Sequence, residues 1–134
     1  MPGKAFVDSN VLLYVFSPDA QKADRAEEVL RQRPVISVQV LNEVMNVMRR
    51  KFGQSWPEVE EFLGTVESLC TVEPLTMESH LEGRRIARRH GLSTYDAMIA
   101  SSALLAGCEV LWSEDMHDGL VIEGQLKITN PFSH

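Results

Sequence analysis

Short runs of apolar residues alternate along the chain with longer stretches in which apolar residues recur every three or four positions. The short runs predict strands over residues 5–7, 35–37, 70–73 and 109–112, with a fifth candidate over 125–129. The longer stretches predict helices over residues 11–16, 21–33, 38–52, 55–69, 76–90 and 93–107. Strands joined by helices favour right-handed crossovers, and therefore an α/β fold with a mostly parallel sheet of four or five strands. No repeat or linker divides the chain, so we expect a single domain over residues 1–134.

Several helix boundaries are marked by single residues. Pro34 stops the helix that precedes it, because proline cannot continue the helical hydrogen bonding. Ser55 and Glu58 have the spacing of a capping box, and Gly91 is the expected C-terminal cap of another helix.

The composition is ordinary for a globular protein, with 44% hydrophobic and 24% charged residues. The formal net charge of −6 argues against a protein that coats nucleic acid or anionic membranes by bulk attraction. No apolar run approaches the roughly 20 residues that span a bilayer, and the first residues lack the apolar core of a secretory signal. Cys70 and Cys108 form neither a disulfide framework nor a zinc cluster, so we expect reduced thiols and a cytoplasmic protein.

Two aspartates stand where predicted strands end. Asp8 follows the first strand directly, and Asp115 follows the fourth at a short distance. The carboxyl ends of parallel strands lie at one edge of the sheet, where α/β proteins bind ligands, so both are candidate site residues. Each has a structural alternative: Asp8 fits the N-cap of the next helix, and Asp115 fits a turn, as does Asp118 before Gly119.

Two further acids fall on apolar helix faces. Glu43 lies three residues after Val40 and four before Val47, which places it within the apolar stripe of its helix. Asp96 stands where the apolar face of its helix begins. The alternative for Asp96 is the last position of a capping box that starts at Ser93. Burying a lone carboxylate costs several kcal/mol unless a partner or a metal offsets it, so these positions favour a site.

The four carboxylates are expected to converge from four separate elements at one end of the sheet. Like charges so close raise one another's pKa and destabilise the fold unless a cation neutralises them. Neither histidine nor cysteine accompanies them in these segments, which favours Mg²⁺ or Mn²⁺ over zinc. An all-carboxylate site with one or two such ions suits the hydrolysis of phosphodiester bonds.

The segments that hold these acids resemble, in order along the chain, the four acidic motifs of PIN-domain nucleases. They read FVDSNVL at 6–12, SVQVLNE at 37–43, STYDAMIA at 93–100 and WSED at 112–115. The closing segment GQLKITNPF at 124–132 resembles the end of many bacterial VapC-type toxins. The resemblance covers nearly the whole chain, and it rests on four motifs in the expected order rather than on any one of them.

The resemblance implies a three-layer α/β/α PIN fold and a Mg²⁺- or Mn²⁺-dependent endoribonuclease that cuts structured RNA such as tRNA or rRNA. It also implies a toxin that forms a homodimer and is inhibited by a small antitoxin protein. Carried over by position, the catalytic and metal-binding acids are Asp8, Glu43, Asp96 and Asp115. Asn10 and Ser113 are then expected to orient carboxylates or waters. Two roles stay open for Asp118, that of a fifth metal ligand and that of a turn residue.

Seven basic residues fall in two clusters near predicted helix ends. As structural groups, they stabilise the negative end of the helix dipole. As functional groups, they contact RNA phosphates. The clusters are Arg49, Arg50 and Lys51, and Arg84, Arg85, Arg88 and Arg89. Both interpretations stay open for each cluster.

Other classes of small α/β protein compete with the nuclease. A receiver-like phospho-acceptor domain needs an aspartate at the end of the third strand, where this chain has Glu73 and Pro74. A phosphatase of the haloacid dehalogenase type needs Asp-x-Asp near the start, and here the third position is Asn10. A catalytically silent PIN-like binding module keeps the fold without the reaction, and an RNA-cleavage assay with Mn²⁺ distinguishes it from an enzyme.

Overall fold

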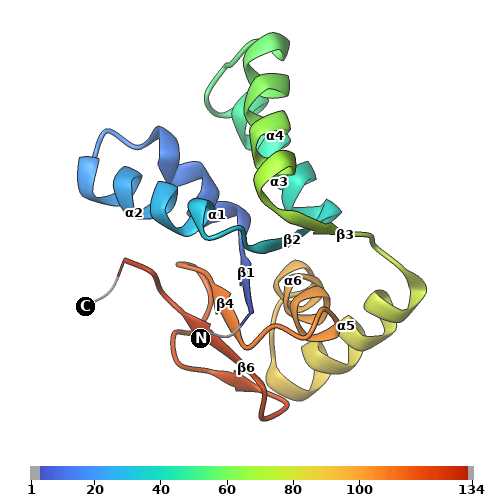
Figure 1. The fold of residues 1–134 in the computed structure, drawn as a ribbon. Helices are drawn as coiled ribbons and strands as arrows, with labels where there is room; N and C mark the ends of the chain where they lie inside the picture. The colour runs from blue at the N-terminus through green and yellow to red at the C-terminus, as the bar shows by residue number, and fades with distance from the viewer. Residues whose placement is uncertain (1–3, 133–134) are drawn as a thin grey trace.

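The computed structural model describes residues 4–132, and its centre is a six-stranded sheet (Figure 1). The strand order is β3-β2-β1-β4-β6-β5, in which β5 runs antiparallel to β6 and every other pair is parallel. The strands are β1 (Ala5–Val7), β2 (Val35–Ser37), β3 (Thr71–Glu73), β4 (Val110–Trp112), β5 (Val121–Ile122) and β6 (Leu126–Thr129).

Helices cover both faces of the sheet and make the three-layer α/β/α arrangement that the sequence predicted (Figure 1). The first four helices contact one another on one side, and α5 packs along α6 on the other. The helices are α1 (Ser9–Leu13), α2 (Ala20–Arg31), α3 (Val38–Arg50), α4 (Trp56–Leu69), α5 (Met77–His90) and α6 (Thr94–Leu105), and a 3₁₀ turn η1 (Tyr14–Phe16) follows α1.

The order of the strands explains the two helical layers. The chain steps from β1 to β2 to β3 in one direction and then returns to the other side of β1 as β4. Right-handed crossovers that run in opposite directions place their helices on opposite faces of the sheet. The reversal leaves a crevice between β1 and β4 at the carboxyl edge, which is where open α/β sheets bind ligands.

Local signals set most helix boundaries as the sequence predicted. Ser55 and Glu58 form both hydrogen bonds of the capping box that starts α4. Gly91 ends α5 in the left-handed conformation, with φ of 69°, which glycine adopts without steric cost. Pro34 lies directly before β2 and after the end of α2.

The prediction of four or five strands was one strand short. Val121 and Ile122 pair with β6 through a tight turn in which Glu123 and Gly124 both have positive φ, of 53° and 65°. The backbone N–H of Gln125 closes this turn on the carbonyl of Ile122 at 3.1 Å, and positive φ at both central positions matches the twist of an antiparallel hairpin. A strand of two residues is too short to produce a periodic pattern, and glutamate is not a residue that marks this turn in a sequence.

The core lies between the layers and is filled by large apolar side chains. The fully buried ones include Phe6, Leu12, Ile36, Met48, Ile86, Ile99, Leu111 and Ile128. Cys70 and Cys108 are free, and burial raises the pKa of both thiols to about 11, so both stay protonated and unreactive at neutral pH. Within residues 4–132, no helix has the length and apolar character needed to cross a membrane.

Candidate active site

Asp8 directly follows β1, next to the end of β4, and is only 4% exposed. Its Oδ1 accepts the backbone N–H of Ser9 at 2.7 Å, at the start of α1. Its Oδ2 accepts the hydroxyl of Ser113 at 2.9 Å and the side-chain amide of Asn10 at 3.1 Å. The helix-cap and site interpretations of Asp8 are therefore compatible, since one oxygen serves the helix and the other faces β4.

Asn10 and Ser113 connect the ends of β1 and β4. The amide nitrogen of Asn10 also lies 3.4 Å from the hydroxyl of Ser113, and its carbonyl oxygen accepts the backbone N–H of Glu114 at 3.1 Å. The backbone N–H of Asp8 donates to the carbonyl of Trp112 at 2.9 Å. These bonds fix the orientation of the Asp8 carboxyl, which is the geometry expected of residues that orient a metal ligand.

Glu43 approaches Asp8 from α3 through Ser9. The Ser9 hydroxyl donates to Glu43 Oε1 at 2.8 Å and lies 3.4 Å from Asp8 Oδ1. The amide of Gln39, one turn earlier on α3, donates to Glu43 Oε2 at 3.1 Å. Ser9 and Gln39 were not singled out from the sequence as partners of Glu43; the i, i+4 spacing of Gln39 and Glu43 is the signal that was available for one of them.

Asp96 lies in the first turn of α6, where Ser93 caps the helix by accepting the Asp96 backbone N–H at 3.4 Å. Among the described residues, the reciprocal bond from Ser93 to the Asp96 carboxylate is absent, unlike the complete box of α4. The capping box therefore does not account for this carboxylate, which lies near enough to Asp8 to act on it electrostatically.

Burial raises the pKa of Asp8 from 3.8 to about 6. The hydrogen bonds from Ser113 and Ser9 oppose this shift, whereas the negative charges of Glu43 and Asp96 add to it. Across residues 4–132, no lysine or arginine forms an ion pair with any of these three acids. The three carboxylates thus share a site without a balancing side-chain cation.

Asp115 and Asp118 occupy the loop after β4 and differ in what they contact. Asp115 is exposed and lines an open cleft together with Ser9 and Asn10. Asp118 is also exposed, but its Oδ1 accepts the backbone N–H of Asn130 at 2.8 Å. Of the two roles left open for Asp118, this contact favours the structural one.

The donor atoms of the site are all oxygens, which fits a hard cation such as Mg²⁺ or Mn²⁺. Within the described part of the chain, however, no three histidine, cysteine or acidic side chains are arranged closely enough to hold an ion. The chemistry of the donor set nevertheless fits a divalent metal.

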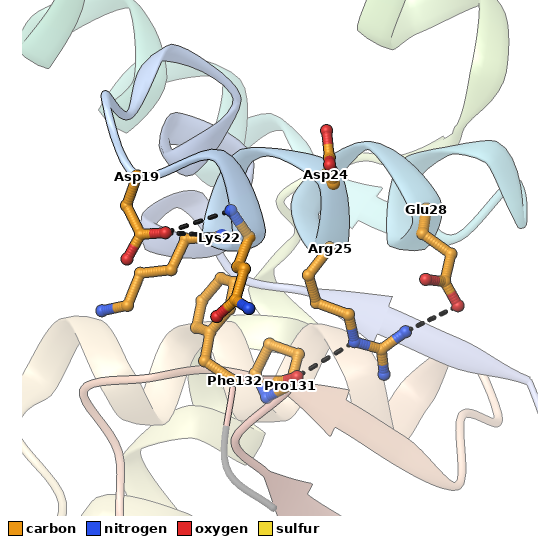
Figure 2. Close-up of a pocket in the computed structure, with 8 residues that line it drawn as sticks. Asp19, Lys22, Asp24, Arg25, Glu28, Pro131 and Phe132 are labelled. Carbon is orange, nitrogen blue, oxygen red and sulfur yellow. Dashed lines mark hydrogen bonds and ion pairs between the residues drawn. The ribbon is translucent and has the colours of Figure 1, made fainter.

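The cleft that Asp115 lines has a volume of about 480 Å³. A second hollow of about 570 Å³ lies between α2 and the last residues of the described chain (Figure 2). There Asp19 caps α2, and Arg25 binds both Glu28, at 3.0 Å, and the carbonyl of Pro131, at 3.0 Å. Its polar groups largely satisfy one another and none belongs to the predicted quartet, so the cleft beside Asp115 is the better candidate for a substrate.

The two basic clusters contact different parts of the molecule. The guanidinium carbon of Arg49 lies 4.6 Å from the ring centroid of Trp56, and Lys51 lines the cleft beside Asp115. In the second cluster, Arg85 and Arg89 both pair with Glu123. The remaining members, Arg50, Arg84 and Arg88, are exposed. RNA contact by either cluster stays a prediction.

Sequence reasoning missed a small polar cluster beside the site. Glu114 accepts a hydrogen bond from the Tyr14 hydroxyl, and its Oε2 forms an ion pair with Lys22 Nζ at 3.2 Å. The Lys22 ammonium also lies over the rings of Tyr14, at 4.7 Å, and Phe132, at 5.5 Å. Tyr14 and Lys22 lie 100 and 92 positions before Glu114, so only the folded chain brings the two parts together. The charge of Glu114 is balanced by Lys22, in contrast to the charges of Asp8, Glu43 and Asp96.

The comparisons with known proteins agree with this architecture. The sequence model of the PIN domain matches residues 5–117, and the chain therefore belongs to the PIN domain family. A toxin–antitoxin complex from Klebsiella pneumoniae contains a chain with a TM-score of 0.73 and 23% identity, covering 98% of this chain and 100% of that one.

Two other solved structures share the fold. VapC20 of Mycobacterium tuberculosis, described as a toxin that cleaves the sarcin–ricin loop, has a TM-score of 0.66 and 20% identity over 84% of this chain and 90% of that one. A DNA-bound VapBC from Salmonella typhimurium has a TM-score of 0.64 and 22% identity, covering 98% of this chain and 99% of that one. Comparison with curated proteins gave no match.

Proposed function

We propose that this PIN domain is a metal-dependent endoribonuclease of the VapC toxin type. The observation that carries the proposal is the buried Asp8 carboxylate, with Glu43 and Asp96 acting on it and, among residues 4–132, no side-chain cation paired with any of the three. A fold maintains such a cluster at a cost in stability, which is the expected consequence of selection for a function. The fold shared with VapC proteins supports the same conclusion.

A Mg²⁺ or Mn²⁺, as one ion or two, would when bound activate a water and neutralise charge at the phosphodiester. The side chains that would hold it are Asp8, Glu43, Asp96 and Asp115. Ser113 and Asn10 hold one oxygen of Asp8 toward β4, and Ser9 and Gln39 hold Glu43. These bonds fix the carboxylates before substrate arrives, so that little orientational entropy is lost during the reaction.

The proposed substrate is a structured RNA such as tRNA or rRNA, and the proposed regulator is a small antitoxin protein that covers the site. Toxin–antitoxin assemblies among the structural neighbours support the second part. We also propose a homodimer. Sedimentation or size-exclusion measurements on the purified chain, with and without a co-expressed neighbouring small protein, test both assemblies.

The decisive experiment is cleavage of purified tRNA and rRNA by the full chain, with the cut ends mapped by primer extension. We expect cleavage with Mg²⁺ or Mn²⁺ and none with EDTA. Asp8→Asn removes a metal-binding carboxylate at nearly constant shape, and should lower the rate by more than the roughly 10–100-fold lost when a supporting residue is removed. Asp24→Asn, at an exposed acid of α2, is the matched control and should leave the rate unchanged.

Circular dichroism of each variant establishes that the fold is intact. Full activity of Asp8→Asn, or undiminished activity in EDTA, contradicts the proposed metal site. If the chain takes up Mn²⁺ but cuts no RNA, it is a silent binding module rather than a nuclease.

A further inference from the structure

The cleft beside the acids has an aromatic wall. Phe16 and Phe52 both line it, and their side chains are 37% and 41% exposed. The two ring centroids lie 6.1 Å apart with an angle of 68° between the planes. Large apolar side chains exposed together in a concave surface are a feature of binding sites, because water contact with them is unfavourable.

The fold fixes the backbone of Phe52 and the ring of Phe16. Phe52 follows α3, where its backbone N–H donates to the Val47 carbonyl at 3.1 Å, and Gly53 turns the chain with φ of 63°. Phe16 packs edge-to-face on Phe62 of α4, with centroids 4.7 Å apart. A preformed surface loses little conformational entropy on binding, which favours affinity for a flat ligand.

The charges around the cleft suit a nucleotide. Lys51 lines the cleft next to Phe52 and supplies an ammonium for a phosphate. Glu114 also lines it, but its charge is paired with Lys22 at 3.2 Å. The same cleft is also lined by Ser9 and Asp115, so it borders the candidate active site.

We propose that this cleft is a base subsite, in which an unpaired nucleobase next to the cleaved phosphodiester stacks on the face of Phe52 and meets Phe16 with its edge. The subsite rests on the proposed nuclease function and deepens it: the substrate must offer a splayed, single-stranded nucleotide at the cut, as in an RNA loop. Single-stranded RNA is read in this way, since every base has a face that can stack on an aromatic ring. Lys51 holds the adjoining phosphate.

The test combines a change in the protein with a change in the RNA. Phe52→Leu keeps an apolar side chain and removes the stacking ring, and an abasic ribose beside the mapped cut removes the base. Each change alone should lower kcat/KM by roughly 5- to 100-fold, mainly through KM. Together they should cost little more than one alone, because both remove the same contact. Leu81→Ala, on an exposed residue of α5 outside the cleft, should leave kcat/KM unchanged with either RNA.

Binding without cleavage separates this inference from the proposed function. Phe52→Trp, combined with Asp96→Asn, places an indole in the cleft, and a single-stranded pentaribonucleotide should quench its fluorescence while its abasic analogue and an RNA duplex should not. If no RNA is cut but this quenching is observed, the base subsite stands and the nuclease function fails. If cleavage occurs and the effects of Phe52→Leu and the abasic site simply multiply, the subsite is wrong. It is also wrong if Phe52→Leu weakens only the binding of a protein partner.

Discussion

Two carboxylates on opposite sides of the molecule show how differently a fold can treat the same chemical group. Glu123, in the turn between β5 and β6, pairs with Arg85 and with Arg89 at 3.4 Å, and the Arg85 contact lowers its pKa. Asp8, at the end of β1, receives hydrogen bonds from the uncharged groups of Ser9, Asn10 and Ser113, and burial raises its pKa to about 6.

The ion pairs of Glu123 stabilise the folded state, whereas the buried charge of Asp8 destabilises it. The Glu123 pair joins the hairpin to α5 at the surface, where a charge is cheaply solvated. The charge of Asp8 is buried beside two others, so its ionised form is stabilised less than it is in the unfolded chain. An acid of the second kind is a strong indicator of a functional site.

The largest effect on stability should come from neutralising Asp8. Its pKa is raised in the folded state, so the folded chain binds the proton more tightly, and its stability falls as pH rises from about 4 to about 6. A shift of about 2 pKa units corresponds to an upper limit of about 3 kcal/mol at pH 7. Asp8→Asn should therefore unfold at higher urea concentration than the parent in EDTA at pH 7, and show no such gain at pH 4. Equal urea midpoints of the variant and the parent at pH 7 would contradict the view that the charge of Asp8 destabilises the folded state.

Removing the Ser113 hydroxyl should have the next largest effect. Ser113 is fully buried and donates to Asp8 Oδ2, so Ser113→Ala leaves the carboxylate less well oriented and raises its pKa further. We expect the Mn²⁺ concentration for half-maximal cleavage to rise by roughly 10–100-fold. Calorimetric titration of Mn²⁺ measures the same loss directly. Ser102→Ala, at another buried serine but outside the site, is the control that should leave Mn²⁺ affinity unchanged.

The smallest effect should come from breaking the Glu123 pair. Arg85→Ala removes the main partner of Glu123 at an exposed position, where ion pairs contribute little to stability. We expect a thermal midpoint only slightly lower than that of the parent at low salt, a difference that shrinks in high salt, and an unchanged cleavage rate. Because the pKa of Glu123 is lowered, its contribution is present at neutral pH and lost as pH falls through that pKa. A large loss of cleavage would instead indicate that this arginine contacts RNA.

The parts of this molecule that follow from local signals could be predicted from the sequence. Ser55, Gly91 and Pro34 mark boundaries by hydrogen bonds or backbone angles that involve only near neighbours. The meeting of Asp8 with Ser113 also follows, because parallel strands bring their carboxyl ends to one edge.

The remaining features depend on distant residues. The pairing of Glu123 with Arg85 and of Glu114 with Lys22 depends on how the layers pack, and no pattern in the sequence encodes it. The role of Asp96 could not be decided from the sequence, since a capping box and a site carboxylate both place an acid at this position. Only the contacts of its side chain distinguish the two.

The hydrogen bonds that join the ends of β1 and β4 also determine when the site comes into being. Asp8 belongs to the first tenth of the chain, while Ser113 and Asp115 belong to its last quarter. A chain that is still being synthesised lacks the strand on one side of Asp8 until residue 112 has emerged, and lacks the last acid until residue 115 has. No N-terminal fragment shorter than this contains all four acids of the candidate site.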